Sequence, residues 1–240
     1  MWRKIIDPLL TLAYPQTCHC CGQSVEESSD GVVCRSCWKK TPVLSGRETI
    51  CHKCGAFLSE RPAAAKTFCH RCDGDFYDRA VAAGFYRLGL SASILHLKRE
   101  PVLPERVRRI FLKRFETAGF PDLDLIIPVP LSRRRFRERG FNQAGIPAGI
   151  LARKTGLHLD ELSLVRRADT PVHRAGMDRK ARAMSVENAF AVKRERFIEG
   201  RKVLLVDDVY TSGATVSNCA GVLRKAGAEC VFVLTLARAD

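Results

Sequence analysis

Apolar and polar residues follow two different patterns along this chain, and the pattern changes after Cys72. Beyond that point, continuous apolar runs typical of buried strands alternate with segments of helical spacing. The runs predict strands over residues 79–86, 123–129, 202–206 and 230–236. The helical segments are residues 91–99, a stretch ending near 118, and residues 142–154 and 216–225. Strands that alternate with helices predict an α/β fold with a parallel sheet and helices on both of its faces.

The first seventeen residues have a different character. Their apolar positions recur at helical spacing, which predicts an amphipathic docking helix over residues 1–17. Pro8 and Pro15 interrupt the segment and no small-residue cleavage site precedes Cys18, so a signal peptide is disfavoured. No apolar run approaches the roughly 18 residues of a membrane helix. We therefore expect a cytoplasmic protein without a membrane span.

Residues 18–75 are rich in cysteine. Eight of the 11 cysteines form four C-x2-C pairs. Each such pair folds as a knuckle whose two thiolates point at one metal ion, and two knuckles complete a closed, tetrahedral, structural zinc site. An all-thiolate site leaves no position for a catalytic water, so a catalytic zinc is disfavoured. The module is short and poor in large apolar residues, and we expect it to unfold without metal.

An internal repeat indicates how the knuckles pair. The segment from Cys18 to Gly22 resembles the segment from Cys51 to Gly55, and a second knuckle follows each of them at a similar distance. The simplest interpretation is two consecutive units with one zinc each. A crossed pairing, first knuckle with third, stays open. In the consecutive interpretation the ligands are Cys18, Cys21, Cys34 and Cys37, then Cys51, Cys54, Cys69 and Cys72.

The segment from Val203 to Thr215 carries the most specific chemistry. A buried strand ends in two adjacent carboxylates, Asp207 and Asp208, and a loop of small hydroxyl residues with one glycine leads into a helix. Backbone N–H groups in such a loop, together with the helix N-terminus, bind a phosphate. Carboxylates at the carboxyl end of a parallel strand, where α/β sheets bind ligands, suit the hydroxyl groups of a ring. The segment therefore predicts a site for a sugar 5-phosphate.

Three other interpretations of this segment are weaker. A Walker loop has a lysine after its glycine, where Ala214 stands here. A response-regulator receiver carries its acidic pair at its first strand, whereas this pair lies about thirty residues from the end of the chain. An ordinary polar turn gives no reason for two adjacent carboxylates beside a phosphate-type loop.

The segment resembles the phosphoribosyl-diphosphate (PRPP) binding motif of type I phosphoribosyltransferases. The chain as a whole is similar to the ComF family, whose ComFC- and GntX-like members are linked to DNA uptake in competent bacteria. The similarity extends over nearly the whole chain and includes the double zinc ribbon. Its further motifs are Ile127–Pro130, Arg135–Gln143, Arg179 and Asn188–Phe190. This resemblance implies a type I phosphoribosyltransferase-like sheet domain at residues 76–240, preceded by a small zinc-ribbon module at residues 18–75.

The resemblance also implies a role for each part of the site. Asp207 and Asp208, the candidate catalytic residues, would contact the 2- and 3-hydroxyls of the ribose. The loop would hold the 5-phosphate, the turn after Pro130 would hold the diphosphate, and Mg²⁺ would bridge hydroxyls and diphosphate. The PRPP-binding set is then Asp207, Asp208, Val209, Thr211, Ser212, Gly213, Ala214 and Thr215, with Leu131, Ser132 and Arg133.

One departure from the family pattern concerns the acceptor. Purine-type members have a catalytic aspartate where Thr211 stands here, so this loop lacks a general base for a purine. Orotate-type members also have a small residue there and use a lysine elsewhere. Lys98 and Lys180 are the candidates for that lysine, although each is more often a solvated charge.

The charge of the chain points to a polyanionic partner. The formal net charge is +14, and the densest basic cluster lies beside the expected diphosphate loop. Its members are Arg133, Arg134, Arg135, Phe136, Arg137 and Arg139. Arginines interleaved with aromatic residues suit the backbone and bases of single-stranded DNA, although a solvated basic face gives the same pattern. A second basic stretch, residues 166–182, is expected to be a flap over the site.

Two functions of different class follow from these observations. In the first, the protein binds PRPP and handles single-stranded DNA together with competence proteins. In the second, it is a metabolic phosphoribosyltransferase that transfers ribose 5-phosphate to a base. Both require PRPP binding.

Overall fold

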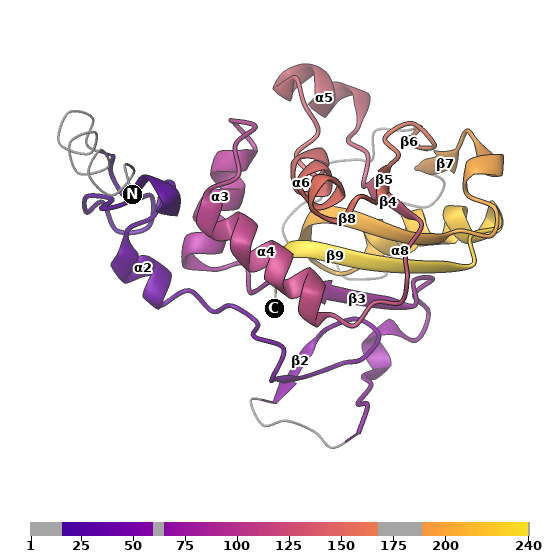
Figure 1. The fold of residues 1–240 in the computed structure, drawn as a ribbon, viewed down its shortest axis with the longest axis horizontal. Helices are drawn as coiled ribbons and strands as arrows, with labels where there is room; N and C mark the ends of the chain where they lie inside the picture. Colours follow the sequence, from indigo (N-terminus) through magenta and orange to yellow (C-terminus); the bar gives the residue numbers. More distant parts are fainter. Residues whose placement is uncertain (1–15, 60–64, 168–188, 240) are drawn as a thin grey trace.

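The computed structural model describes residues 16–59, 65–167 and 189–239. Its centre is a five-stranded sheet in the order β3-β9-β8-β4-β5, in which every neighbouring pair is parallel (Figure 1). The strands are β3 (Arg79–Ala82), β4 (Leu125–Pro128), β5 (His158–Leu159), β8 (Lys202–Tyr210) and β9 (Cys230–Arg238). The predicted α/β architecture with a parallel sheet is confirmed.

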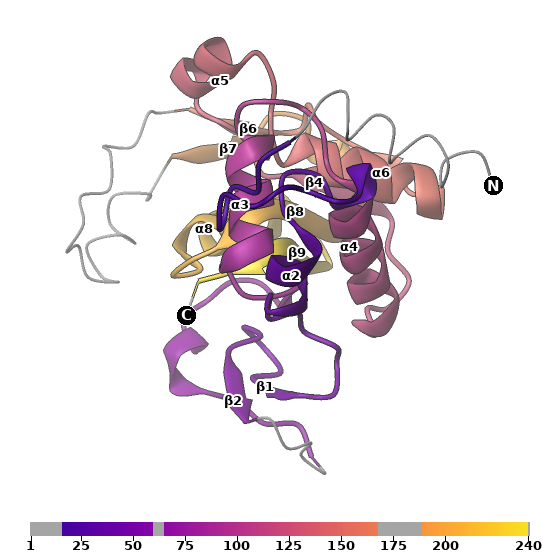
Figure 2. The same cartoon turned by 90° about the vertical axis from the view of Figure 1, so that its left-hand side faces the viewer.

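Both faces of the sheet are covered, which explains why its central strands are apolar without alternation. Leu204 and Val206 of β8 belong to a core shared with α3, α4 and α6. Val203 and Leu205 belong to a second core shared with α8. The helices are α3 (Leu88–Leu97), α4 (Glu105–Thr117), α6 (Gly145–Thr155) and α8 (Ala214–Lys225). Figure 2 shows the two layers on either side of the sheet.

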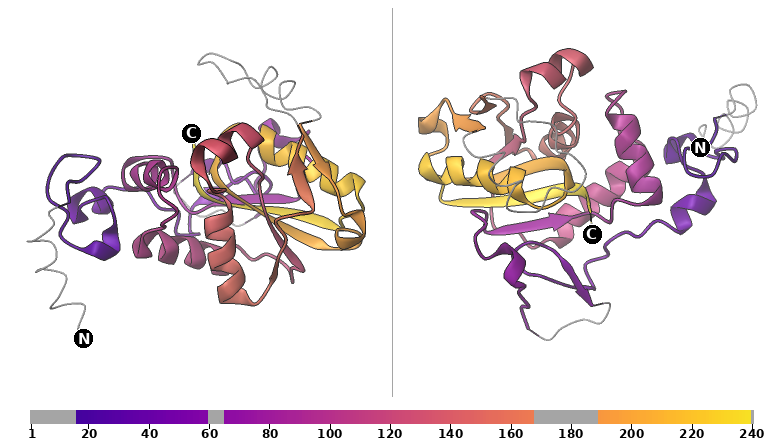
Figure 3. Two further views of the ribbon diagram at one scale, coloured as in Figure 1. Left: turned by 90° about the horizontal axis from the view of Figure 1, so that it is seen from above. Right: turned by 180° about the vertical axis from the view of Figure 1, so that it is seen from behind.

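Several features of the fold differ from the sequence-based prediction. The strand expected over residues 79–86 ends at Ala82, and β5 was not predicted. The strand expected to end at Val206 continues to Tyr210, because β8 stays paired with β9 as far as Arg238. A short helix that was not predicted, α5 (Arg133–Arg139), follows β4 and lies beyond the carboxyl end of that strand (Figures 1 and 3). A small antiparallel pair, β6 (Leu164–Arg166) and β7 (Phe190–Val192), packs on the α8 side. No helix within the described ranges is long and apolar enough to cross a membrane.

The two groups of knuckles lie at different places on the sheet domain (Figures 1 and 2). The first zinc unit, residues 18–37, includes η1 (Ser28–Asp30) and leads into α2 (Arg35–Lys39). It packs against α3 and α4: Trp38 is buried, and the Arg106 guanidinium lies 5.4 Å from the centre of its ring. Asp30 accepts a hydrogen bond of 2.9 Å from Arg106.

The second zinc unit, residues 51–72, packs against the opposite core. The small strand β1 (Thr49–Ile50) precedes it, and it contains β2 (Phe57–Ser59) and ends in η2 (His70–Cys72). Cys51, Cys54 and Cys72 share a hydrophobic cluster with residues of β8 and α8. The backbone of Ala80 in β3 donates a hydrogen bond of 2.6 Å to the carbonyl of Lys53. The two units therefore stand on opposite faces of one sheet.

Candidate functional site

The two adjacent carboxylates lie near the carboxyl end of the central strand β8. Val203–Val206 are completely buried, and they fix the strand between its neighbours β9 and β4. Asp207 is paired in register with Thr235 of β9. The acidic pair therefore follows a fully buried part of the sheet and lies at the end of the strands, where parallel α/β proteins bind ligands.

The carboxylate of Asp208 has one oxygen whose hydrogen bonding is incomplete. Its Oδ1 accepts a hydrogen bond of 2.8 Å from the backbone N–H of Val209, and Oδ1 of Asp207 accepts one of 2.8 Å from Asp208. Oδ2 of Asp208 is buried and has no hydrogen-bond partner among the described residues. The Lys98 ammonium of α3 lies 3.5 Å from it. A buried polar atom of this kind is costly unless a ligand or water completes its bonding.

The electrostatic environment opposes ionisation of Asp207. Burial, followed by the neighbouring Asp208, raises the pKa of the Asp207 carboxyl well above its usual range, and Lys98 opposes the shift only partly. Two carboxylates side by side are unfavourable unless a cation or hydroxyl donors compensate them. The pair therefore favours a ligand that brings such donors. The structure places Lys98 beside the pair, whereas the other candidate, Lys180, lies outside the described residues.

The loop from Thr211 to Gly213 connects β8 to α8 and has the backbone of an anion site. Gly213 is the residue that caps α8 and adopts a left-handed conformation with φ of 82°. The Ser212 hydroxyl accepts from the Ala214 N–H at 3.5 Å, and the Ser217 N–H bonds to the carbonyl of Gly213 at 2.8 Å. The first N–H groups of a helix have no partner within it, so this loop and the start of α8 can bind a phosphate.

A buried pair of tyrosines supports this loop from below. A β-carbon at Gly213 would lie 2.3 Å from the Tyr210 hydroxyl, so only glycine fits against it. Tyr77 donates the single proton of its hydroxyl to Asp75 at 2.6 Å, so it accepts a hydrogen bond from the Tyr210 hydroxyl, which lies 2.7 Å away. Tyr77 follows the last cysteine of the second zinc unit by five positions. The loop and the second zinc unit are therefore connected through two side chains, a connection that the sequence did not reveal.

The expected diphosphate turn begins at the end of the neighbouring strand. The Val129 N–H donates to the Val206 carbonyl at 2.8 Å, so the end of β4 lies beside the start of the acidic pair. Ser132 is buried and caps α5, where its hydroxyl accepts from the Arg135 N–H at 3.3 Å. Leu131 is partly buried and Arg133 is exposed. The sheet thus places the Leu131–Arg133 turn and the Asp207–Thr215 segment at the end of adjacent strands.

The arginine cluster forms the exposed helix α5. All of its arginines from Arg133 to Arg137 are exposed, and Phe136 keeps 50% of its surface accessible. Arg134 pairs with Glu138 at 3.3 Å, and Arg139 donates to Gln143 at 2.8 Å. One helix therefore presents several cations and an aromatic ring to solvent beside the diphosphate turn. The second basic stretch falls largely on residues 168–188, outside the described residues, as does most of the predicted helix at residues 1–17.

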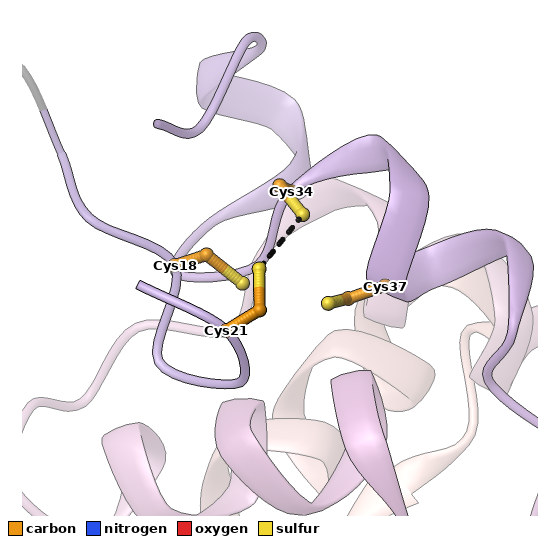
Figure 4. A group of neighbouring side chains, drawn as sticks. All are labelled: Cys18, Cys21, Cys34 and Cys37. Carbon is orange, nitrogen blue, oxygen red and sulfur yellow. Dashed lines mark hydrogen bonds between the residues drawn. The ribbon is translucent and has the colours of Figure 1, made fainter. Parts of the chain in front are cut away.

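The eight knuckle cysteines gather as two consecutive groups and not as a crossed pair. Within each group all Sγ atoms lie within 4.8 Å of one another. Measured Sγ–Sγ separations are 3.7 Å for Cys21–Cys34, which Figure 4 shows, and 3.7, 3.5 and 3.8 Å in the second group. Four sulfurs at about 2.3 Å from a tetrahedral zinc are about 3.8 Å apart. The groups therefore fit structural zinc, in which the metal crosslinks two knuckles.

The backbone around the first cysteine of each group favours thiolates. Burial alone would raise the pKa of Cys18, but N–H groups from Cys34, Cys20 and Cys21 directed at its sulfur lower it to about 6. In the second unit burial likewise acts to raise the pKa of Cys51, but N–H groups from Cys54, Cys69 and Lys53 lower it to about 7. A thiolate is the form that ligates a metal. Cys219 is fully buried in the sheet core, as expected for a structural cysteine.

Comparison with known protein families divides the chain in the same way. The family described as a double zinc ribbon domain matches residues 9–74, and the phosphoribosyl transferase domain matches residues 143–240. With the two cysteine groups, the first match supports two structural zinc sites. The second match contains the acidic pair and the phosphate-type loop.

Similar proteins are named for DNA utilization or for competence. "DNA utilization protein YhgH" of Salmonella typhi is 30% identical over 95% of this chain and 99% of its own length. "Competence protein F" of Haemophilus influenzae is 40% identical over 48% of this chain and 51% of its own. "Competence protein ComFC" of Bacillus subtilis is 34% identical over 50% of this chain and 47% of its own.

Proposed function

Since this chain belongs to the ComF family, with the DNA utilization protein YhgH and the competence proteins F and ComFC, we propose that it binds PRPP with Mg²⁺ and handles single-stranded DNA during uptake. The observation that carries the proposal is the end of β8. There, a buried carboxylate oxygen of Asp208, which has no hydrogen-bond partner in the part of the chain that the structure describes, lies beside a glycine loop at the start of a helix. A ribose hydroxyl completes the bonding of the first, and a 5-phosphate binds the second.

Each part of the ligand has a matching element. Asp207 and Asp208 accept hydrogen bonds from the ribose hydroxyls, and residues Thr211–Thr215 hold the 5-phosphate by backbone N–H groups and hydroxyls. The Leu131–Arg133 turn binds the diphosphate. Mg²⁺ held together with the ligand would offset the charge that the two carboxylates and the diphosphate bring together. Val209 and Ala214 complete the set as backbone of the strand and the helix start.

The DNA part of the proposal rests on α5 and on the family. Helix α5 presents exposed arginines around Phe136, a combination that suits phosphates and stacked bases. The net charge of +14 favours a polyanion in general. Competence proteins are its expected partners. The zinc thiolates suit the reducing cytoplasm, where we place the protein. We further propose that the chain divides after residue 75, into a zinc-ribbon module and the sheet domain.

A metabolic phosphoribosyltransferase is the second candidate, and Lys98 is the observation that favours it. Its ammonium lies 3.5 Å from Asp208, close enough to offset negative charge at the reacting centre. In this reaction a nitrogen of the acceptor base forms a bond to C1 of the ribose. The C1–O bond to diphosphate breaks, and the diphosphate leaves with the electron pair. Thr211 cannot take the proton of the nitrogen, which passes to water.

Calorimetric titration with PRPP and Mg²⁺ tests the shared part of both candidates. We expect the Asp207→Asn, Asp208→Asn variant to lose PRPP affinity on the order of 100-fold, because each carboxylate accepts a charge-assisted hydrogen bond. The matched control, Glu116→Gln with Asp122→Asn, removes two exposed carboxylates elsewhere and is expected to bind as the wild type does. Undiminished PRPP binding by the first variant would show that the ligand lies elsewhere.

Two further measurements separate the candidates. Diphosphate release that depends on an added base identifies the transferase. Salt-dependent binding of a short single-stranded oligonucleotide identifies the DNA-handling protein, and replacing Arg134 and Arg137 by alanine is then expected to lower the salt slope by about one per arginine. Arg153→Ala with Lys154→Ala, at the exposed end of α6, is the control.

A further inference from the structure

A cleft with a volume of about 770 Å³ lies away from the β8 loop, and no part of the proposed PRPP site belongs to it. Four segments of the chain surround it: the linker between the zinc units, the second zinc unit itself, the segment that follows β3, and the end of β9. Four arginines line it, namely Arg47, Arg71, Arg87 and Arg238. The size is that of a site for a small organic ligand.

The cleft is electropositive because its four guanidinium groups outnumber its single carboxylate, Glu48. Glu48 accepts hydrogen bonds from the N–H groups of Ser45 and Gly46 at 2.9 and 3.0 Å and from the Ser45 hydroxyl at 2.8 Å. Burial opposes ionisation of Glu48, but these donors outweigh it and lower the pKa of its carboxyl. The carboxylate thus holds its own turn in shape, while the four guanidinium groups give the cleft its charge. Guanidinium groups of this kind bind phosphate oxygens in pairs.

Aromatic rings line the same cleft as these cations. The rings of Phe57 and Phe85 meet edge to face, with centroids 5.8 Å apart, and Phe57 keeps 37% of its surface accessible. Val43, Leu44 and Ala56 extend this apolar surface. An exposed phenylalanine that is braced by a second ring offers a flat platform. A base can stack on such a platform, and stacking accepts any base because every base has a π face.

Arg238 ties the cleft to the rest of the fold. Its side chain is 8% exposed, it donates a hydrogen bond of 2.9 Å to the Cys54 carbonyl, and it lies 5.1 Å from the centre of the Tyr210 ring. One cation of the cleft is therefore fixed in place by the second zinc unit and by the strand that leads to the phosphate loop. A fixed cation loses little conformational entropy when an anion binds.

We propose that this cleft binds a nucleotide, with the base on Phe57 and the phosphate on the surrounding arginines. The ligand is either a free nucleoside monophosphate or one nucleotide unit of a single strand, since both present a base beside a phosphate. Neither cations nor rings alone define this class, but the two together in the lining of one cleft do. The site does not depend on what binds at β8, and it would stand if PRPP were not the ligand there.

The test uses the full zinc-loaded protein with saturating PRPP and Mg²⁺, so that added nucleotides do not occupy the β8 loop. Calorimetric titrations with AMP, dTMP, an oligothymidine of eight nucleotides and an abasic strand of the same length are compared. Phe57→Ala and Arg47→Ala change exposed side chains, so the fold is retained, which zinc content verifies. We expect each to weaken binding about ten-fold. Phe68→Ala, an exposed phenylalanine of the second zinc unit outside the cleft lining, is expected to have no effect.

The titrations also separate the two sources of the nucleotide. Binding of AMP or dTMP supports a free nucleotide, whereas binding of oligothymidine alone, lost with the abasic strand, supports a unit of a single strand. The proposal is overturned if inorganic phosphate or a poly-glutamate peptide binds as tightly as the nucleotides do, because the aromatic rings then have no role. It is equally overturned if no nucleotide or oligonucleotide binds, or if Phe57→Ala leaves their affinity unchanged.

Discussion

The two zinc units are built from the same C-x2-C knuckles, yet they contact different parts of the molecule. The first lies against α3 and α4, where Trp38 and Arg106 make its main contacts. The second lies against the α8 side and leads, through Tyr77 and Tyr210, to the loop at Gly213. The Phe76 N–H also bonds to the hydroxyl of Ser217 in α8 at 3.1 Å. Similar metal sites therefore serve different ends: one covers helices, and the other braces the candidate phosphate loop.

The origin of this difference lies in the residues that follow each unit. After Cys37 the chain places a tryptophan against the helices, and Gly89 of α3 makes room for it, since a β-carbon there would lie 2.7 Å from the Trp38 ring. After Cys72 the chain places Phe76 against Ser217 of α8 and Tyr77 against Tyr210 at the end of β8. A repeated metal site thus acquires its role from its flanking sequence and not from its ligands.

Loss of one metal site is expected to give the largest contrast between the units. Cys72→Ser removes a buried ligand of the second unit, and Cys21→Ser an exposed ligand of the first. Because zinc binding provides the folding energy of such units, about 10–16 kcal/mol per site, each variant should lose one zinc. We expect Cys72→Ser to weaken PRPP binding at least ten-fold. Cys21→Ser is expected to change the PRPP affinity by no more than about two-fold, which corresponds to a change in binding free energy below about 0.5 kcal/mol.

Calorimetry with parallel zinc analysis measures this contrast. An equal loss of PRPP affinity in both variants would break the comparison, because it would mean that the units act only through general stability. Retained affinity in Cys72→Ser, with its zinc gone, would show that the phosphate loop does not need the second unit.

Removing one hydroxyl tests the connection without removing metal. Tyr77→Phe breaks the hydrogen bonds to Tyr210 and Asp75 while it keeps the ring in the core. The buried hydroxyl of Tyr210 then loses its partner at a cost of about 1–3 kcal/mol, and Gly213 loses a fixed neighbour. We expect a PRPP affinity about five-fold lower, with two zinc ions retained. Tyr86→Phe, on the face of the first unit, is the control and should bind PRPP normally.

The smallest expected effect is on the free energy of unfolding, and it comes from the charge of the Asp207 carboxylate. Because the folded-state pKa of Asp207 is raised, its ionised carboxylate destabilises the fold above that pKa, and the penalty disappears as the pH falls through it. Asp207→Asn should therefore raise the free energy of unfolding at pH 7 by on the order of 1 kcal/mol while it weakens PRPP binding. Urea unfolding from pH 5 to 8 is the measurement. The difference in free energy of unfolding between Asp207→Asn and the wild type should become smaller at low pH. A difference that stays constant with pH would mean that it arises from packing and not from charge.

Local patterns in the sequence were sufficient for much of the fold. The continuous apolar run of β8 and the C-x2-C spacing predicted the central strand and the zinc knuckles, because both signals lie within a few residues. The internal repeat predicted that the knuckles pair consecutively. The ComF-type resemblance is confirmed by relatives that align over nearly the whole chain. The continuation of β8 to Tyr210 was missed, since Asp207 and Asp208 interrupt the apolar pattern although the backbone stays paired with β9.

Contacts between distant residues were out of reach of the sequence. Tyr77 and Tyr210 are 133 positions apart, and the arginines and phenylalanines of the nucleotide cleft come from four separate segments. Helix α5 was missed for another reason: its arginine-rich sequence has no apolar face, and its start is marked only by the Ser132 cap. Such features follow from tertiary packing, which no local periodicity encodes.

Amide hydrogen exchange with and without PRPP and Mg²⁺ tests the central claim most directly, because it locates the ligand on the unmodified protein. The account predicts slower exchange at residues 207–215 and 131–133 when PRPP is present, and unchanged exchange over residues 18–37 of the first zinc unit. Absence of protection at residues 211–215, or protection confined to the cleft segments 42–48 and 85–87, would contradict it.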